Sequence, residues 1–214
     1  MPRMDDYVQA VLLGKAALTG ATPDLLARLA GAEIRKESAE SVSLLVPFLN
    51  DEVSVTWDDL RFQSTRSGQE PPIQQQILLL HYLKGAWASG GAVATGQWIS
   101  FQEIPDGRFY MDAFQRRAKN PLVQAFGEKP ERLIGIAGDA YGAVPLDQGD
   151  FSVVVKVLPL VPMALVLWRG DEEFPPEGNI LFDRNISAIL SAEDIAWLAG
   201  MVVYPLAGMA TQRI

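Results

Sequence analysis

The densest group of acidic side chains in the sequence is a run of three carboxylates, Asp171, Glu172 and Glu173, with Asp183 beyond the next predicted strand. Carboxylates without Cys or His neighbours suit hard cations such as Mg²⁺ or Ca²⁺, and burial can tune one for general acid–base chemistry. The spacing matches no calcium-loop pattern, so no particular metal site is predicted. An acidic run at a turn is also typical of a solvated corner, with Phe174 as its apolar anchor.

A second group lies on segment 97–104, which alternates like a strand and ends beside the Pro-Asp-Gly turn at residues 105–107. Trp98, Glu103 and Asp106 would line a cleft at this strand end, since ligand sites combine apolar walls with a few polar groups. The alternative is that Trp98 packs in the core and that Glu103 is an edge charge.

Basic residues concentrate in segment 108–132, which has a net charge of +3 within a chain whose net charge is −8. Guanidinium groups form paired hydrogen bonds with carboxylates and phosphates, so Arg108, Arg116 and Arg117 are candidates for an anion contact. A solvent-exposed helix face has the same composition, and the pattern leaves both interpretations open.

The sequence contains one histidine, His81, and no cysteine. Without cysteine the chain forms no disulfide, no thiolate metal site and no iron–sulfur cluster of its own. His81 can carry a proton near neutral pH, but it falls on the polar seam of an apolar helix, where it can equally lack a task. The sequence motifs of P-loop nucleotide binding, of α/β-hydrolases and of zinc proteases are missing. No particular cofactor is therefore indicated.

The composition is that of a folded acidic protein, with 214 residues of which 49% are apolar and 21% charged. It excludes a disordered or fibrous chain, and the length fits a single domain over residues 1–214. The acidic balance argues against nucleic acids as partners, because phosphate contacts need clustered Lys and Arg. We expect no targeting segment, and we interpret the uncharged run 195–212 as a buried core helix of a cytoplasmic protein that contacts no membrane.

Apolar periodicity predicts the elements that position these residues. Helical spacing marks segments 5–18, 23–30, 71–87, 109–136 and 195–212, the fourth with interruptions near Pro121 and Pro130. Alternation marks strands at 42–48, 53–57, 97–104, 151–157, 163–168 and 179–182, and Phe62 extends the first hairpin. The strands cluster in two hairpin groups, which predicts an α+β fold with a mainly antiparallel sheet packed against several helices.

Two stretches of the sequence resemble a prokaryotic family catalogued only as a domain of unknown function. They are Q-W-I-S-F at 97–101 with I-P-D-G-R-F-Y at 104–110, and W-R-G-D-E-E-F-P at 168–175 with I-L-F-D at 180–183. The resemblance covers residues 75–200. It implies relatives mainly in anaerobic bacteria and archaea, some with an added iron–sulfur domain like that of corrinoid iron–sulfur proteins. Because this chain has no cysteine, such a cluster would belong to a partner protein.

Three hypotheses for the function follow. The first is a non-catalytic accessory domain of anaerobic metabolism that binds a small molecule or a protein partner, in a site where the Trp98 strand meets the corner at residues 168–174, which begins with Trp168. The second is a carboxylate enzyme, Mg²⁺-dependent in one version, that uses Glu103, Glu172, Glu173 or Asp183. The third is a structural subunit of an oligomer, whose state the sequence leaves open.

Overall fold

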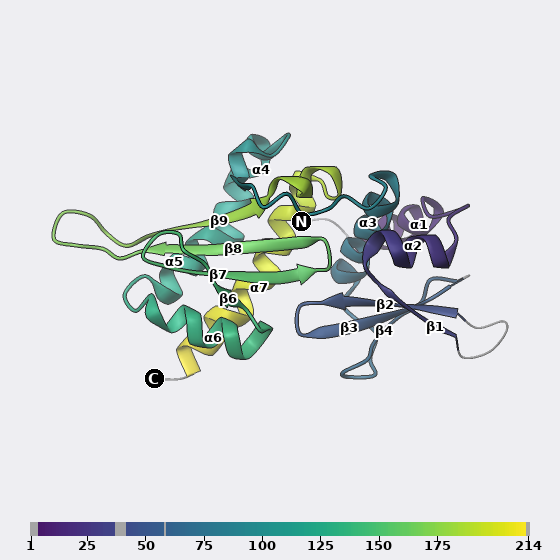
Figure 1. Cartoon of the computed structure of the whole chain (residues 1–214), viewed down its shortest axis with the longest axis horizontal. Helices are drawn as coiled ribbons and strands as arrows, with labels where there is room; N and C mark the ends of the chain where they lie inside the picture. The colour runs from purple at the N-terminus through teal and green to yellow at the C-terminus, as the bar shows by residue number, and fades with distance from the viewer. Residues whose placement is uncertain (1–3, 37–41, 58, 213–214) are drawn as a thin grey trace. The chain divides into compact units, whose positions relative to one another are not determined.

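The computed structural model describes residues 4–36, 42–57 and 59–212 (Figure 1). Two antiparallel sheets and several helices confirm the predicted α+β class with two hairpin groups. The chain divides into two compact units: unit 1 comprises residues 1–93, 158–160 and 188–190, and unit 2 comprises residues 94–157, 161–187 and 191–214. A single domain over the whole chain stays a prediction.

Unit 1 contains a four-stranded sheet whose strands follow one another in chain order (Figure 1). The predicted hairpin is confirmed, with Val46 opposite Val53, and Phe62 extends it as the start of the edge strand. The elements of unit 1 are α1 (Met4–Ala16), α2 (Pro23–Ala30), β1 (Glu33–Lys36), β2 (Val42–Phe48), β3 (Asp51–Thr56), β4 (Phe62–Ser64) and α3 (Ile73–Ala88).

The central helix of unit 1 is α3, as its almost uniformly apolar sequence predicts. It contacts α1 and α2, and Leu79 and Leu83 have no exposed surface. The buried Tyr82 hydroxyl donates a hydrogen bond to the Ala30 carbonyl at 2.6 Å and accepts one from the Leu160 amide at 3.3 Å. Burial raises the pKa of the Tyr82 hydroxyl, so the group keeps its proton and remains a donor at neutral pH.

Unit 2 contains a five-stranded sheet in the order β5-β9-β8-β7-β6. Its strands are β5 (Trp98–Ser100), β6 (Val144–Pro145), β7 (Phe151–Leu158), β8 (Val161–Trp168) and β9 (Glu177–Asp183). Its helices are α4 (Gly107–Phe114), α5 (Asn120–Phe126), α6 (Glu131–Tyr141) and α7 (Ala192–Gln212). The stacked rings of Phe101 and Phe114, 4.2 Å apart, lie against Phe182 of β9 and join α4 to the sheet.

The core helix of unit 2 is α7, which contacts α4, α5 and α6. Its fully buried residues recur three or four positions apart, as on one face of a helix, and include Ile195, Leu198, Val202 and Leu206. Among the described helices, only the stretch Ala192–Thr211 is long and apolar enough to cross a membrane, and half of it is buried inside the structure. The packing supports the predicted core helix, whereas the cytoplasmic location stays a prediction.

The predicted strand over segment 97–104 is wrong beyond Ser100. Residues Phe101–Glu103 form a 3₁₀ turn, because the Glu103 carboxylate accepts hydrogen bonds from the main-chain N–H and the hydroxyl of Ser100, both at 2.8 Å. This Ser-x-x-Glu cap starts a helical turn at the point where the strand would otherwise continue.

The predicted interruption near Pro130 is confirmed, whereas the one near Pro121 is wrong. Helical structure runs from Gly107 to Phe126 through the π-helical turn Gln115–Lys119. In that turn the Asn120 N–H donates to the Gln115 carbonyl, five residues earlier. The wider turn accommodates the Pro121 ring, which an uninterrupted α-helix would press against the carbonyl four residues before it.

Gly85 allows α3 to approach the segment Ala188–Leu190, which belongs to the same unit. A Cβ atom at Gly85 would overlap the main-chain carbonyl of Ile189. Because main-chain atoms cannot move aside as a flexible side chain can, this position requires glycine although it lies inside a helix.

We expect Gly85→Ala to destabilise the protein by about 1–3 kcal/mol, the usual cost of overpacking. Gly135→Ala in α6 is the matched control, because a Cβ atom there meets nothing within 4 Å, and it should stabilise by about 0.5–1 kcal/mol through helix propensity. Urea unfolding followed by circular dichroism measures both changes. A neutral or stabilising Gly85→Ala would contradict the close approach.

Candidate functional site

The residues predicted to share a site lie at the two ends of β9. Trp98 pairs with Asp183 at one end of this strand, and Trp168 pairs with Glu177 at the other. At about 3.3 Å per residue, the six steps along the strand from Glu177 to Asp183 span about 20 Å. The structure therefore does not bring the Trp98 strand and the acidic corner around a shared hollow. Trp98 is half-buried, and Trp168 is 39% exposed and lies against Gly149.

Asp183 is the buried carboxylate of this sheet, with 1% of its surface exposed. It accepts hydrogen bonds from the main-chain N–H groups of Thr95, Gly96 and Asn185, at 2.9, 2.7 and 3.0 Å, and from the Thr95 hydroxyl at 2.9 Å. Burial alone would raise the pKa of Asp183, but these hydrogen bonds outweigh it and hold the pKa below its ordinary value. Asp183 thus anchors the chain that enters unit 2 and has a structural task.

Glu103 and Asp106 frame the turn before α4. Both are exposed, and the hydrogen bonds from Ser100 lower the pKa of Glu103. Asp106 has a left-handed main chain, with φ at 61°, at the position before the first helical residue Gly107. Each residue therefore shapes a local turn, and both keep their carboxylates in solvent.

The three predicted anion-binding arginines have different surroundings. Arg108 is exposed on α4. Arg116 forms an ion pair at 2.6 Å with Asp112, one helical turn earlier. The guanidinium of Arg117 lies over the Trp197 ring of α7, 5.5 Å from its centre. Arg117 thus packs two helices together, whereas Arg108 faces solvent.

The acidic corner is a turn at the tip of the long β8–β9 hairpin (Figure 1). The Asp171 carboxylate accepts hydrogen bonds from the main-chain N–H groups of Glu173 and Phe174, each at 2.8 Å, and these bonds lower the pKa of Asp171. Glu172 and Glu173 are exposed. Glu103 and Asp183 lie at the opposite end of β9, so the four carboxylates of the enzyme hypothesis do not converge. Within residues 4–36, 42–57 and 59–212, no group of three His, Asp or Glu side chains is arranged to hold a metal ion.

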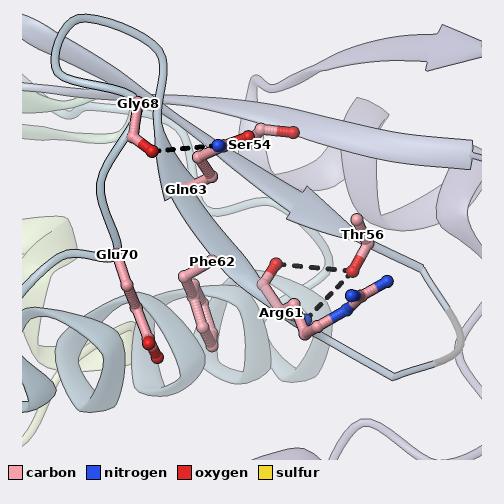
Figure 2. Close-up of a pocket in the computed structure, with 7 residues that line it drawn as sticks. All are labelled: Ser54, Thr56, Arg61, Phe62, Gln63, Gly68 and Glu70. Carbon is pink, nitrogen blue, oxygen red and sulfur yellow. Dashed lines mark hydrogen bonds between the residues drawn. The ribbon is translucent and has the colours of Figure 1, made fainter.

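A hollow of about 350 Å³ lies in unit 1, at the β4 edge of the sheet (Figure 2). It is lined by Ser54, Thr56, Arg61, Phe62, Gln63, Gly68 and Glu70. The loop after β4 folds back along that edge: the Ser64 amide donates to the Gln69 carbonyl at 2.9 Å, and the Gln63 side chain donates to the Gly68 carbonyl at 3.0 Å. These two bonds hold the loop against β4.

Hydrogen bonds within the β3–β4 region and to α3 hold several side chains around the hollow. The Thr56 hydroxyl donates to the Asp59 carboxylate at 2.5 Å and accepts from the Arg61 main-chain N–H at 3.0 Å. The hydrogen bond from Thr56 and the neighbouring Arg61 guanidinium lower the pKa of Asp59. In Figure 2, Arg61 lies beside Thr56, whereas Phe62 and Glu70 point to the other side of the strand. Glu70 accepts a hydrogen bond from Gln76 of α3 at 2.9 Å.

The sequence does not predict this hollow. Its lining residues are ordinary polar side chains on a strand pair and a loop, with no motif spacing that marks a site. The one available signal was the pair Pro71 and Pro72 at the end of the loop that follows the edge strand, since proline cannot continue a ladder of main-chain hydrogen bonds.

Asp183→Asn is expected to lower the free energy of unfolding by about 1–3 kcal/mol at pH 7, because an NH₂ group would replace one carboxylate oxygen opposite main-chain donors. The folded-state pKa of Asp183 is depressed, so the wild-type advantage is complete above the ordinary value of 3.8 and shrinks as the pH falls through the lower folded-state pKa. Urea unfolding of both proteins from pH 7 downwards measures this difference. Asp147→Asn, at an exposed position, is the control and should change stability by less than about 0.5 kcal/mol. A difference that grows on acidification would contradict the assignment.

Comparison with known proteins shows which family the chain resembles. A family model described as "Domain of unknown function (DUF3786)" matches residues 22–204, a wider span than the segment that carries the sequence resemblance. No curated protein and no solved structure matches the chain. An origin in anaerobes and a fusion to iron–sulfur domains stay predictions. The match spans most of the sequence, and the chain therefore belongs to the DUF3786 family, a family of domains of unknown function.

Proposed function

We propose that this chain is a non-catalytic binding domain that takes a small polar ligand in the hollow at the β4 edge. The observation that carries the proposal is the convergence of two hydroxyls, an amide, a guanidinium and a carboxylate on one hollow of about 350 Å³. Pockets for small molecules begin at about 300 Å³ and use a few placed polar groups to orient the ligand.

The charges at the hollow favour a ligand that carries both signs. Asp59 engages the Nε atom of Arg61, and a guanidinium has further N–H donors that can bind a carboxylate. Glu70 presents an exposed carboxylate that can attract an ammonium group. The hollow therefore offers a positive and a negative group to a polar ligand, on the two sides of the strand.

The accessory role beside an iron–sulfur protein, which the family resemblance implies, is a separate part of the proposal. Support for a protein contact comes from α4, where Phe109 is 86% exposed and follows the exposed Arg108. Aromatic residues and arginine are enriched at protein interfaces. The basic segment that contains both residues would meet an acidic surface of the partner.

The ligand proposal predicts that free amino acids shift the amide resonances of the residues that line the hollow. Arg61→Gln and Glu70→Gln should each weaken this binding about tenfold, the effect of losing one charged contact of about 1.4 kcal/mol. A two-dimensional ¹H–¹⁵N titration with glycine, serine and glutamine measures the affinity.

Two variants serve as controls. Arg66→Gln changes an exposed arginine of the same loop that does not line the hollow, and it should bind as the wild type does. Ser54→Leu fills the hollow from β3 and should abolish binding, whereas Ser54→Ala should retain most of it. Binding that survives Ser54→Leu would place the ligand elsewhere.

A further inference from the structure

The edge of the unit 1 sheet that lies opposite the hollow is β1. This strand is the last one on its side of the four-stranded sheet, and among the described residues no further strand pairs with it. Glu33, Arg35 and Lys36 are exposed, and Ile34 is partly buried. The helix α2, which precedes β1, contacts β2 as well as β1, so it lies over the face of the sheet. The exposed side chains show that β1 is accessible to solvent.

The main-chain groups of Ile34 point outward from this edge. In the neighbouring pair β2–β3, the Trp57 N–H donates to the Val42 carbonyl at 2.7 Å, so the even-numbered residues of β2 bond to β3 and the odd-numbered ones face β1. Ser43 of β2 therefore bonds to its register partner Arg35. Ile34, the residue before Arg35, directs its N–H and C=O away from the sheet, and one rung for a further strand is open there.

Ile34 is also the end of a row of apolar side chains that crosses the sheet. The row runs through the register partners Leu44, Val55 and Phe62, which are 0%, 0% and 5% exposed. Ile34 is the member of this row that stays partly in solvent. A strand added at the β1 edge, with an apolar residue opposite Ile34, would bury it and extend the row.

A second copy of this chain carries such a strand, and symmetry limits how the two copies can pair. A two-fold axis perpendicular to the sheet makes the two β1 strands antiparallel and keeps corresponding faces of the two sheets on the same side. Odd-numbered residues then lie opposite odd-numbered ones, and even-numbered residues lie opposite even-numbered ones. The pairing must therefore be centred on one of the four residues of β1.

The charges of β1 select one of these four registers. A pairing centred on Glu33, Arg35 or Lys36 places two like charges directly opposite each other, which destabilises a strand pair. A pairing centred on Ile34 places the two Ile34 side chains opposite each other and Glu33 of each copy opposite Arg35 of the other. These Glu33–Arg35 positions are the non-hydrogen-bonded pairs, in which the side chains lie closer. The sequence Glu-Ile-Arg at 33–35 is thus complementary to itself.

We propose that β1 is an interface between two copies of this chain, which joins their four-stranded sheets into one continuous sheet. The two Ile34 residues exchange both main-chain hydrogen bonds of one rung, and an ion pair between Glu33 and Arg35 lies on each side of them. Charged residues on edge strands ordinarily prevent pairing, but on β1 they repel every symmetric register except this one.

Two properties of the dimer follow from the position and length of β1. Because the strand has four residues, the interface is small and the dimer dissociates on dilution. Because β4 and its hollow lie at the opposite edge of the sheet, dimerisation leaves the hollow free.

Sedimentation velocity over a range of protein concentrations measures the dimer, and the wild type should change from monomer to dimer as the concentration rises. Arg35→Glu places an acidic side chain opposite Glu33, and Glu33→Arg places a basic one opposite Arg35. Each variant alone should weaken dimerisation about tenfold. An equimolar mixture of the two variants restores both opposite-charge pairs and should dimerise as the wild type does.

Arg66→Glu is the matched control, because it makes the same charge change at an exposed position of the loop after β4. This variant should dimerise with the affinity of the wild type. Thermal unfolding followed by circular dichroism should show that all three variants are folded, since each changes an exposed side chain.

Hydrogen exchange tests the rung itself. The Ile34 N–H should exchange rapidly in dilute protein and become protected as the concentration rises, whereas the Arg35 N–H, which bonds to β2, should be protected throughout. A chain that stays monomeric at every concentration overturns the inference. It is also overturned by a dimer that both single variants leave unchanged, or by a mixture of the two variants that dimerises no better than either one alone.

Discussion

The structure depends on how the main-chain N–H and C=O groups at the ends and edges of its strands find hydrogen-bonding partners. An extended strand presents N–H and C=O groups on both sides, and each group that leaves water must find a partner. In unit 2, the Asp183 carboxylate supplies that partner for three main-chain amides at the entry to the sheet. In unit 1, the folded-back loop pairs with Ser64 at the β4 edge of the sheet. A buried carboxylate thus satisfies the main-chain groups at one place, and a folded-back loop satisfies them at another.

The parts of the fold that apolar patterns determine were predictable from the sequence. The hairpin of β2 and β3, the strands β7 to β9 and the helices α2, α3 and α7 all alternate or recur at the period of their element, because one face of each is buried. β1, Glu33–Lys36, has one apolar residue and was missed, since its place comes from main-chain pairing with β2. The π-helical turn before Pro121 was missed for a related reason: its hydrogen bonds join main-chain atoms and leave no trace in side-chain periodicity.

The candidate site was harder to predict than the fold. The tryptophan, carboxylate and arginine residues of unit 2 were predicted to form a site because such side chains bind ligands or metals. In the structure, most of them have local structural roles. Glu103 caps a turn, Asp171 closes another, and Arg117 packs against Trp197. The hollow in unit 1 depends instead on the path of the loop that returns along the β4 edge. Such a property depends on strand register, which a single sequence does not reveal.

The membership of residues 158–160 and 188–190 in unit 1 has a consequence for how the chain acquires its structure during synthesis. The ribosome releases the amino-terminal half long before these two short segments exist. Until then, the Tyr82 hydroxyl lacks the hydrogen bond from the Leu160 N–H, and α3 lacks its close contact at Gly85 with the Ile189 main chain. The nascent amino-terminal half therefore cannot complete its packing until these later segments are made. Contacts between residues far apart in the sequence are associated with slow folding.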